Sequence, residues 1–201
     1  MKLEKIPGED EAWAKLATLD PVRVCCRAEV RFDEQAETYA LESYGCEISV
    51  SPREKKIFSD SPRGADLLDR VDASLAILWY LTSSHSFPPS GNLIAPGSLP
   101  GGQIFEKGTH VLPLEPLAEK YADAPEAFIE TGRIWGGDVL DYGDASVQLF
   151  PLPQVPTTLI LRTADEEFPS LVNLLIDSNC KFQFPTDIVW AMCMMSALIM
   201  R

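Results

Sequence analysis

The sequence contains little positive charge. Its 201 residues include 17 Lys and Arg against 30 Asp and Glu, which gives a formal net charge of −13 at pH 7. A field of that sign repels a phosphate backbone, and no basic cluster stands out from it. We therefore expect no nucleic-acid partner.

Long apolar runs and regular cysteine spacings are also missing. The most apolar stretch, residues 188–200, is shorter than the roughly 20 residues that span a bilayer, so we expect no membrane segment. The five cysteines include no CxxC pair, which fits neither a four-cysteine metal cluster nor a disulfide framework. Because the acidic N-terminus does not resemble a secretory signal, these features predict a cytoplasmic protein with reduced thiols.

We predict no metal site and no cofactor from the residue spacings. Asp138, Asp141 and Asp144 do not follow the alternating pattern of a calcium loop, which also needs a glycine at its sixth position. Cys25 and Cys26 are adjacent, and on the strand that we expect there they point to opposite faces. They therefore cannot bind one ion together.

The length and an apolar content of 46% suit one domain over residues 1–201. Its first 60 residues predict a short helix and then an antiparallel meander, because apolar and polar residues alternate. The helix is expected over 9–18, and the strands over 22–30, 36–43 and 44–51, with a short fourth strand over 55–59. On the third strand Cys46, Ile48 and Val50 fall on one face.

Helical periodicity replaces this alternation in the middle of the chain. Apolar residues recur at helical spacing over 66–81, which predicts one central helix. A Ser-, Pro- and Gly-rich connection over 83–113 follows, and its length makes it a candidate for function. Two short helices come next, the second opened by a capping box of Asp123 and Glu126 and ended by Gly136-Gly137.

The last third of the chain returns to strand composition. Strands are expected over 146–150, 157–163 and 171–177, before a nearly all-apolar, Met-rich helix over 187–200. The predicted class is therefore α+β: two antiparallel three-strand segments with a central helix, two short helices and an apolar C-terminal helix. A helix that is apolar all round is either core or an interface shared across a homodimer.

The long connection contains the motif LPGGQIFEKGTHVLP over 99–113. Gly101 and Gly102 can turn the backbone to positive φ and present bare amides to a ligand. His110 is a candidate general base, metal ligand or loop-capping hydrogen-bond donor, and the last of these is the plainer interpretation. His85, the only other histidine, precedes two prolines and is expected to be exposed.

Acidic and amide side chains gather around the last predicted strand. Asp165, Glu166 and Glu167 could hold a hard cation or give one carboxyl group a raised pKa for acid–base work, or they simply stabilise a hairpin turn, which we favour. Asn173 and Asp177 share one face of the strand, because i and i+4 coincide in a period of two. That face lines a cleft or faces solvent.

Residues 61–201 resemble a known family, most clearly beyond residue 99. The matching segments are LPGGQIF (99–105), LPLEPLAEKYADAPEAF (112–128), Gly136-Gly137, Gly143-Asp144, PLPQVPTTLIL (151–161), DEEFP (165–169), NLLID (173–177) and Pro185-Thr186-Asp187. The family is a domain of unknown function from anaerobic bacteria and archaea, whose longer members carry a four-cysteine iron–sulfur module and are labelled iron–sulfur cluster proteins. This chain lacks that module. The resemblance therefore implies an anaerobe's accessory protein, linked to corrinoid or one-carbon metabolism.

These features together predict a cytoplasmic binding or accessory module with an unknown small ligand or protein partner. The candidate pocket lies between the 99–110 loop and the 165–177 connection, where glycine amides, His110 and the carboxylates would meet. One alternative is a hydrolase or lyase that uses the carboxylates with His110. A further alternative is a structural homodimer formed through residues 187–200.

Overall fold

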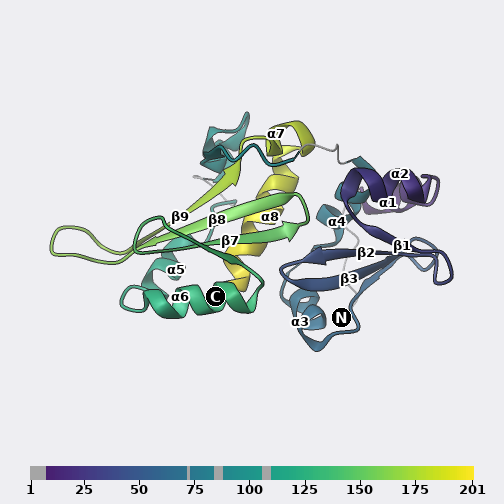
Figure 1. The fold of residues 1–201 in the computed structure, drawn as a ribbon. Helices are drawn as coiled ribbons and strands as arrows, with labels where there is room; N and C mark the ends of the chain where they lie inside the picture. The colour runs from purple at the N-terminus through teal and green to yellow at the C-terminus, as the bar shows by residue number, and fades with distance from the viewer. Residues whose placement is uncertain (1–7, 72, 84–87, 106–109) are drawn as a thin grey trace.

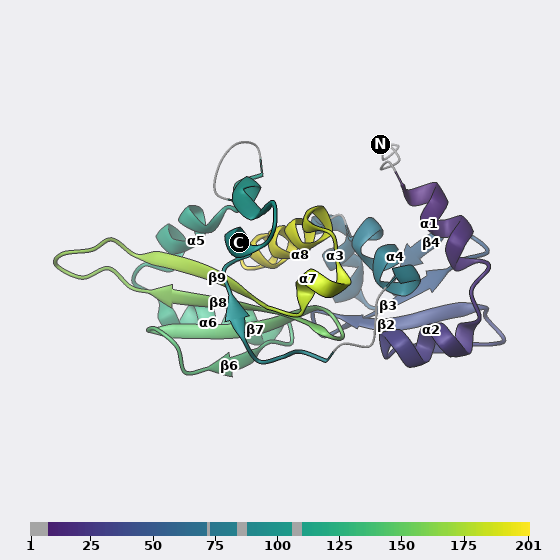
Figure 2. The ribbon, with the colours of Figure 1, turned by 90° about the horizontal axis from the view of Figure 1, so that it is seen from above.

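The computed structural model describes residues 8–71, 73–83, 88–105 and 110–201. Two antiparallel sheets lie side by side, one from the N-terminal and one from the C-terminal part of the chain (Figures 1 and 2). Helices pack against both sheets. This arrangement confirms the predicted α+β class, although the C-terminal sheet has five strands where we expected three.

The N-terminal sheet is a four-stranded meander in the order β1-β2-β3-β4. Its strands are β1 (Arg31–Asp33), β2 (Thr38–Ser43), β3 (Cys46–Ser51) and β4 (Lys56–Phe58), and helix α1 (Glu9–Leu16) precedes it. The alternation predicted for β3 is confirmed, because Cys46, Ile48 and Val50 are all buried.

Residues 22–30 do not form the expected strand but lie mostly in helix α2 (Pro21–Ala28). The side chain of Asp20 caps the helix by accepting a hydrogen bond from the Val22 amide at 3.0 Å. The proline that follows Asp20 occupies the first helical turn, where its missing N–H is not needed. These start signals outweigh the strand preference of the valines, and Val22 is 75% exposed.

The single central helix predicted over 66–81 is two helices. Helix α3 (Pro62–Arg70) ends at Val71, whose backbone is extended with φ −132° and ψ 137°, and α4 (Ser74–Ser83) starts afterwards. Apolar residues on both sides of the break are buried, for example Leu67 and Leu78. The sequence pattern therefore looks continuous although the backbone is not.

The C-terminal sheet has the order β5-β9-β8-β7-β6. Its strands are β5 (Leu93–Ile94), β6 (Asp138–Leu140), β7 (Ala145–Leu152), β8 (Val155–Arg162) and β9 (Leu171–Asp177). The three long strands at its centre confirm the prediction. The two edge strands were not predicted, because segments of two and three residues are too short to show an alternation.

Three helices cover one face of this sheet, as Figures 1 and 2 show. They are α5 (Leu114–Lys120), α6 (Pro125–Ile134) and α8 (Thr186–Ile199), while α7 (Cys180–Gln183) follows β9 and the short 3-10 turns η1 (Pro96–Ser98) and η2 (Gly102–Phe105) lie in the long connection. The predicted capping box on α6 is wrong. The N-cap is Ala124, which has no side-chain group to accept a bond, so Asp123 falls one position too early.

The two sheets meet where the β2–β3 turn reaches β7. The backbone amide of Tyr44 donates to the carbonyl of Phe150 at 2.8 Å, and the Ser43 hydroxyl donates to the carbonyl of Pro151 at 2.8 Å. The ring of Tyr44 is fully buried. A turn of the N-terminal sheet thus forms part of the core of the C-terminal half.

Candidate functional site

The glycine corner of the long connection lies against the start of α8. Gly101 has a positive φ of 77°, as the Pro-Gly-Gly sequence predicts. The Gly102 amide donates to the carbonyl of Leu99 at 2.8 Å, so it is already used inside the bend. The hydroxyl of Thr186 donates to the carbonyl of Pro100 at 2.9 Å, which fastens the corner to α8.

His110 is exposed and lies against the same helix, where it contacts Trp190. Its backbone carbonyl accepts a hydrogen bond from Trp190 Nε1 at 2.7 Å, and the two rings meet edge to face with centroids 4.9 Å apart. Trp190 comes one helical turn after Thr186, so both ends of the 101–110 segment are attached to the first turns of α8. His85 lies outside the described residues.

The carboxylate of Asp177 is buried and well supplied with hydrogen-bond donors. The Ser90 hydroxyl lies 3.0 Å from both carboxylate oxygens, and the amides of Gly91 and Asn179 each donate at 2.8 Å. Burial alone acts to raise the pKa of Asp177, but these hydrogen bonds outweigh it and hold the pKa below its usual range. Asp177 thus ties the segment before β5 to the end of β9.

The acidic motif before β9 forms a tight turn. Asp165 Oδ1 accepts hydrogen bonds from the amides of Glu167 at 2.8 Å and Phe168 at 2.7 Å. The Asp165 amide in turn donates to the carbonyl of Phe168 at 3.0 Å. This geometry favours the turn interpretation of the motif and leaves Glu166 and Glu167 exposed to solvent.

The structure divides the expected site residues into two groups. Asp177 ends β9, whereas the acidic turn precedes its first residue, and seven residues of strand span about 20 Å. The glycine corner belongs to the Asp177 side, because Pro100 is hydrogen-bonded to Thr186 at the start of α8, and α8 follows the Asp177 end of β9 after the short helix α7. The structure therefore does not bring the glycine corner and the acidic turn together, since the length of β9 lies between them (Figure 1).

Asn173 lies on the uncovered face of the C-terminal sheet. Its neighbours Val172 and Leu174 are buried beneath the helices, while Asn173 is exposed, so the predicted two faces of this strand are both observed. Across the sheet Asn173 pairs with Ile160 of β8. Asn173 therefore shares the open face with Leu171, two residues closer to the acidic turn.

A cavity of about 450 Å³ lies beside the acidic turn at the end of the β8–β9 hairpin. Its lining residues are Arg162, Thr163, Asp165, Phe168, Pro169, Ser170 and Leu171. Phe168 is 66% exposed and Leu171 is 50% exposed, which is unusual for large apolar side chains. Only Asp165 of these residues was predicted. The available signal was the Phe-Pro pair that directly follows the three acids.

Asp144, in the β6–β7 turn, binds Thr163, the first residue of the loop between β8 and β9. Its Oδ2 accepts hydrogen bonds from the amide of Thr163 at 2.7 Å and from the Thr163 hydroxyl at 2.9 Å. These bonds hold the pKa of Asp144 below its usual range, and the nearby Arg162 acts in the same direction. The carboxylate therefore stays charged and fixes the cavity wall.

The cysteines are five free thiols. Cys25 and Cys26 lie on helix α2, so the expectation that they face opposite sides of a strand was wrong. Burial raises the pKa of the Cys180 thiol to about 12, which keeps it protonated and unreactive. Within the part of the chain that the structure describes, no three His, Cys, Asp or Glu side chains gather into a group that could hold a metal ion.

No helix formed by the described residues is long and apolar enough to cross a membrane.

The comparisons with known proteins give one result. No curated protein and no solved structure shows a significant match to the chain. A family model does match, over residues 20–198. Because this match covers most of the chain, the protein belongs to the family described as "Domain of unknown function (DUF3786)".

Proposed function

We propose that this protein is a binding or accessory module without catalytic activity, and that a partner docks at the end of the β8–β9 hairpin. The observation that carries the proposal is the cavity of about 450 Å³, where the exposed side chains of Phe168 and Leu171 lie beside the acidic turn. Exposed apolar surface rimmed by polar residues is typical of interaction sites.

The charge around the cavity indicates the chemistry of the partner. Asp165 and Arg162 are the charged residues of its lining, and the exposed Glu166 and Glu167 follow Asp165 in the same turn. The chain as a whole carries a net charge of −13, so an acidic partner is repelled. A peptide segment that carries Lys or Arg next to apolar side chains matches both the charge and the apolar surface.

The hydrogen bonds of the predicted site residues argue for binding rather than catalysis. General acid–base catalysis needs its groups within hydrogen-bond reach of one reacting centre. The Asp177 carboxylate is engaged by three residues, and Asp165 is engaged by its own turn. Because β9 separates these two carboxylates, they do not support the alternative of a hydrolase or lyase that uses them with His110.

A peptide-binding experiment tests the proposal. Fluorescence anisotropy compares a labelled peptide of alternating Lys and Leu with two matched peptides, one with Glu for Lys and one with Ser for Leu. We expect binding of the first peptide only. Phe168→Ser should weaken it at least about 5-fold, as for a side chain at the centre of an interface. Glu166→Gln with Glu167→Gln should weaken it and reduce its dependence on salt.

Matched controls separate specific docking from general attraction to an acidic protein. Val22→Ser removes an exposed apolar side chain from α2. Glu54→Gln removes an exposed negative charge from the β3–β4 turn of the N-terminal sheet. Both controls should bind the Lys–Leu peptide as the unaltered protein does. If the hairpin variants and the controls bind equally well, the docking surface is not at the hairpin.

The enzyme alternative is tested separately. Chromogenic esters, phosphate esters and glycosides should show no turnover above background. Turnover that disappears in His110→Ala, at an unchanged melting temperature, would instead establish a catalytic role for His110.

The accessory role in corrinoid or one-carbon metabolism, and the anaerobic origin that the resemblance implies, belong to the same proposal. Anaerobic purification followed by an absorption spectrum and a native mass tests it, because a bound corrinoid adds visible absorption and mass. The same mass distinguishes a monomer from a homodimer. The burial of Met192, Met195 and Ile199 within the chain favours a core role for α8, so Met195→Lys should yield a misfolded chain rather than a stable monomer.

A further inference from the structure

A second cavity lies in the N-terminal half, away from every residue considered as a site so far. It has a volume of about 410 Å³ and opens between the α1–α2 connection and strands β1 and β2. Its apolar lining consists of Leu16, Ala17, Leu19, Pro21, Phe32, Tyr39 and Pro52. The volume and the apolar walls fall in the range of small-molecule sites.

Tyr39 is the lining residue of these apolar walls whose side chain ends in a hydroxyl group. The residue is 1% exposed, and its ring contacts that of Phe32 with centroids 4.7 Å apart. Among the described residues no group forms a hydrogen bond with the Tyr39 hydroxyl. The hydroxyl oxygen is not completely shielded from solvent, so a polar group of a ligand in the cavity can reach it and form a hydrogen bond. Burial raises the pKa of Tyr39, which keeps the hydroxyl protonated and able to donate.

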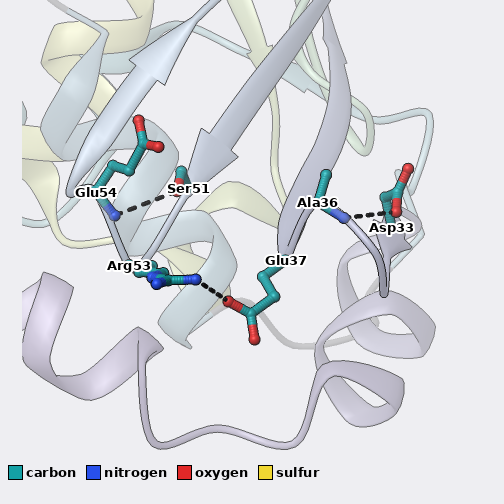
Figure 3. A network of polar contacts seen from close by, with 6 residues as sticks. All are labelled: Asp33, Ala36, Glu37, Ser51, Arg53 and Glu54. Carbon is teal, nitrogen blue, oxygen red and sulfur yellow. Dashed lines mark hydrogen bonds and ion pairs between the residues drawn. The ribbon is translucent and has the colours of Figure 1, made fainter.

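The rim of the cavity carries an excess of negative charge. Glu34, Glu37 and Arg53 are its charged residues. Arg53 Nη1 lies 3.4 Å from Glu37 Oε2, and Figure 3 shows the two side chains pointing toward one another. In the described parts of the chain Glu34 forms no ion pair, so its charge is uncompensated. A cationic group is therefore the complement of this rim.

The loops that carry the rim are held by their own hydrogen bonds. Asp33 Oδ1 accepts from the amide of Ala36 at 2.9 Å, and Ser51 Oγ accepts from the amide of Glu54 at 3.2 Å (Figure 3). These bonds fix the β1–β2 and β3–β4 turns next to the cavity. The rim is thus pre-formed, which reduces the entropy lost when a ligand binds.

We propose that this cavity binds a small aromatic amine. Its ring packs against Phe32 and Tyr39, a hydrogen-bonding group on the ring reaches the Tyr39 hydroxyl, and its ammonium group lies at the rim beside Glu34. This site is independent of the hairpin surface, because the two share no residue.

Ligand-observed NMR titration with three probes of one size tests the site. Tyramine carries both the ring hydroxyl and the ammonium group, phenethylamine lacks the hydroxyl, and 4-hydroxyphenylacetate replaces the ammonium with a carboxylate. We expect tyramine to bind most tightly, phenethylamine about 5-fold more weakly, and 4-hydroxyphenylacetate at least about 10-fold more weakly than tyramine.

Two variants assign these differences to named groups. Tyr39→Phe should weaken tyramine about 5-fold and leave phenethylamine within about 2-fold, which is the signature of one shared hydrogen bond. Its melting temperature should not fall, because the hydroxyl has no partner to lose among the described residues. Glu34→Gln should weaken both amines about 3-fold.

Glu54→Gln serves as the charge-matched control, since Glu54 is exposed but does not line the cavity. It should leave all three affinities unchanged. The proposal is overturned if neither amine binds at 10 mM, which is about the weakest binding that a ligand of nine or ten non-hydrogen atoms should show. It is also overturned if 4-hydroxyphenylacetate binds as well as the amines, or if Tyr39→Phe weakens both amines equally. Binding of the Lys–Leu peptide in Tyr39→Phe reports on the hairpin alone, so the two proposals fail separately.

Discussion

The hydroxyl of Tyr44 lies 2.8 Å from the hydroxyl of Ser196, and both side chains are fully buried. The Ser196 hydroxyl also lies 2.8 Å from that of Thr157 and donates to the carbonyl of Met192 at 3.0 Å. This chain of hydroxyls joins the β2–β3 turn to α8 and β8. A polar connection between the two sheets therefore runs through the interior of the protein.

Removing an end of this connection, Tyr44, and removing its middle member, Ser196, should destabilise the fold by different amounts. Tyr44→Phe deletes one buried hydrogen bond and should lower the free energy of unfolding by about 1 kcal/mol. Ser196→Ala should cost about 2 kcal/mol, because the buried hydroxyls of Tyr44 and Thr157 both lose a 2.8 Å hydrogen bond and keep only carbonyl contacts of 3.4 Å. Urea denaturation measures both values. Tyr142→Phe is the matched control, since Tyr142 is 50% exposed and should change stability by less than about 0.5 kcal/mol. Equal losses in all three variants would contradict the network.

Gly136 lies close to Gly45 of the N-terminal half. It has a φ of 68°, and a Cβ atom added there would lie 2.8 Å from the Cα of Gly45. Gly136→Ala should therefore lower the free energy of unfolding by more than about 2 kcal/mol, from backbone strain and from the steric clash. Gly91→Ala isolates the strain, because Gly91 has a φ of 76° with nothing within 4 Å of an added Cβ. It should cost about 1 kcal/mol. A Gly136 loss no larger than that of Gly91 would mean that the contact is loose.

Stability should fall at alkaline pH because buried thiols stay protonated in the folded state. Burial raises the pKa of Cys180 to about 12 and also raises that of Cys193, from an ordinary value of 9.0. Above pH 9 the unfolded chain loses these protons and the folded chain keeps them. The free energy of unfolding then falls by about 1.4 kcal/mol per pH unit for each thiol.

Cys180→Ala tests this interpretation through the slope rather than through the absolute stability. Between pH 9 and pH 10 its free energy of unfolding should fall less steeply than that of the unaltered protein, because Cys193 and Cys25, whose pKa values burial also raises, still contribute. Above pH 10 the buried Tyr44 and Tyr80, whose pKa values burial also raises, add to the decline in both proteins. An unchanged slope in Cys180→Ala would show that this thiol ionises equally in both states.

Strand and helix periodicity were sufficient to predict most of the fold. β2, β3 and the three long strands of the C-terminal sheet were predicted correctly because each has at least one buried face over six residues or more. The strand expected over 22–30 failed because the signal that decides it, an Asp-Pro start, lies before the segment. Burial on both sides of Val71 hid the break between α3 and α4.

The candidate site was less predictable, since it depends on which segments, far apart in the sequence, lie close together in the fold. Sequence spacing correctly gave Asn173 and Asp177 one face of β9, but it could not show that the acidic turn and Asp177 lie at opposite ends of that strand. Tyr44 was expected at the start of a strand. It instead forms a buried turn, because its partners, Phe150 and Ser196, are more than 100 residues away.

Asp177 offers a test of whether its carboxylate serves the fold. Its pKa is lowered in the folded state, so it contributes stability above the unfolded pKa of about 3.9, and this contribution is lost as the pH falls through the lower folded value. Asp177→Asn should lower the free energy of unfolding by about 2 kcal/mol at pH 7, because a charged acceptor is lost from the Ser90 and Gly91 donors. At pH 3 the difference between the two proteins should shrink, since the aspartate then begins to protonate. Glu166→Gln, at an exposed position of the acidic turn, should change stability at neither pH. A loss that is the same at both pH values would mean that shape rather than charge makes Asp177 necessary.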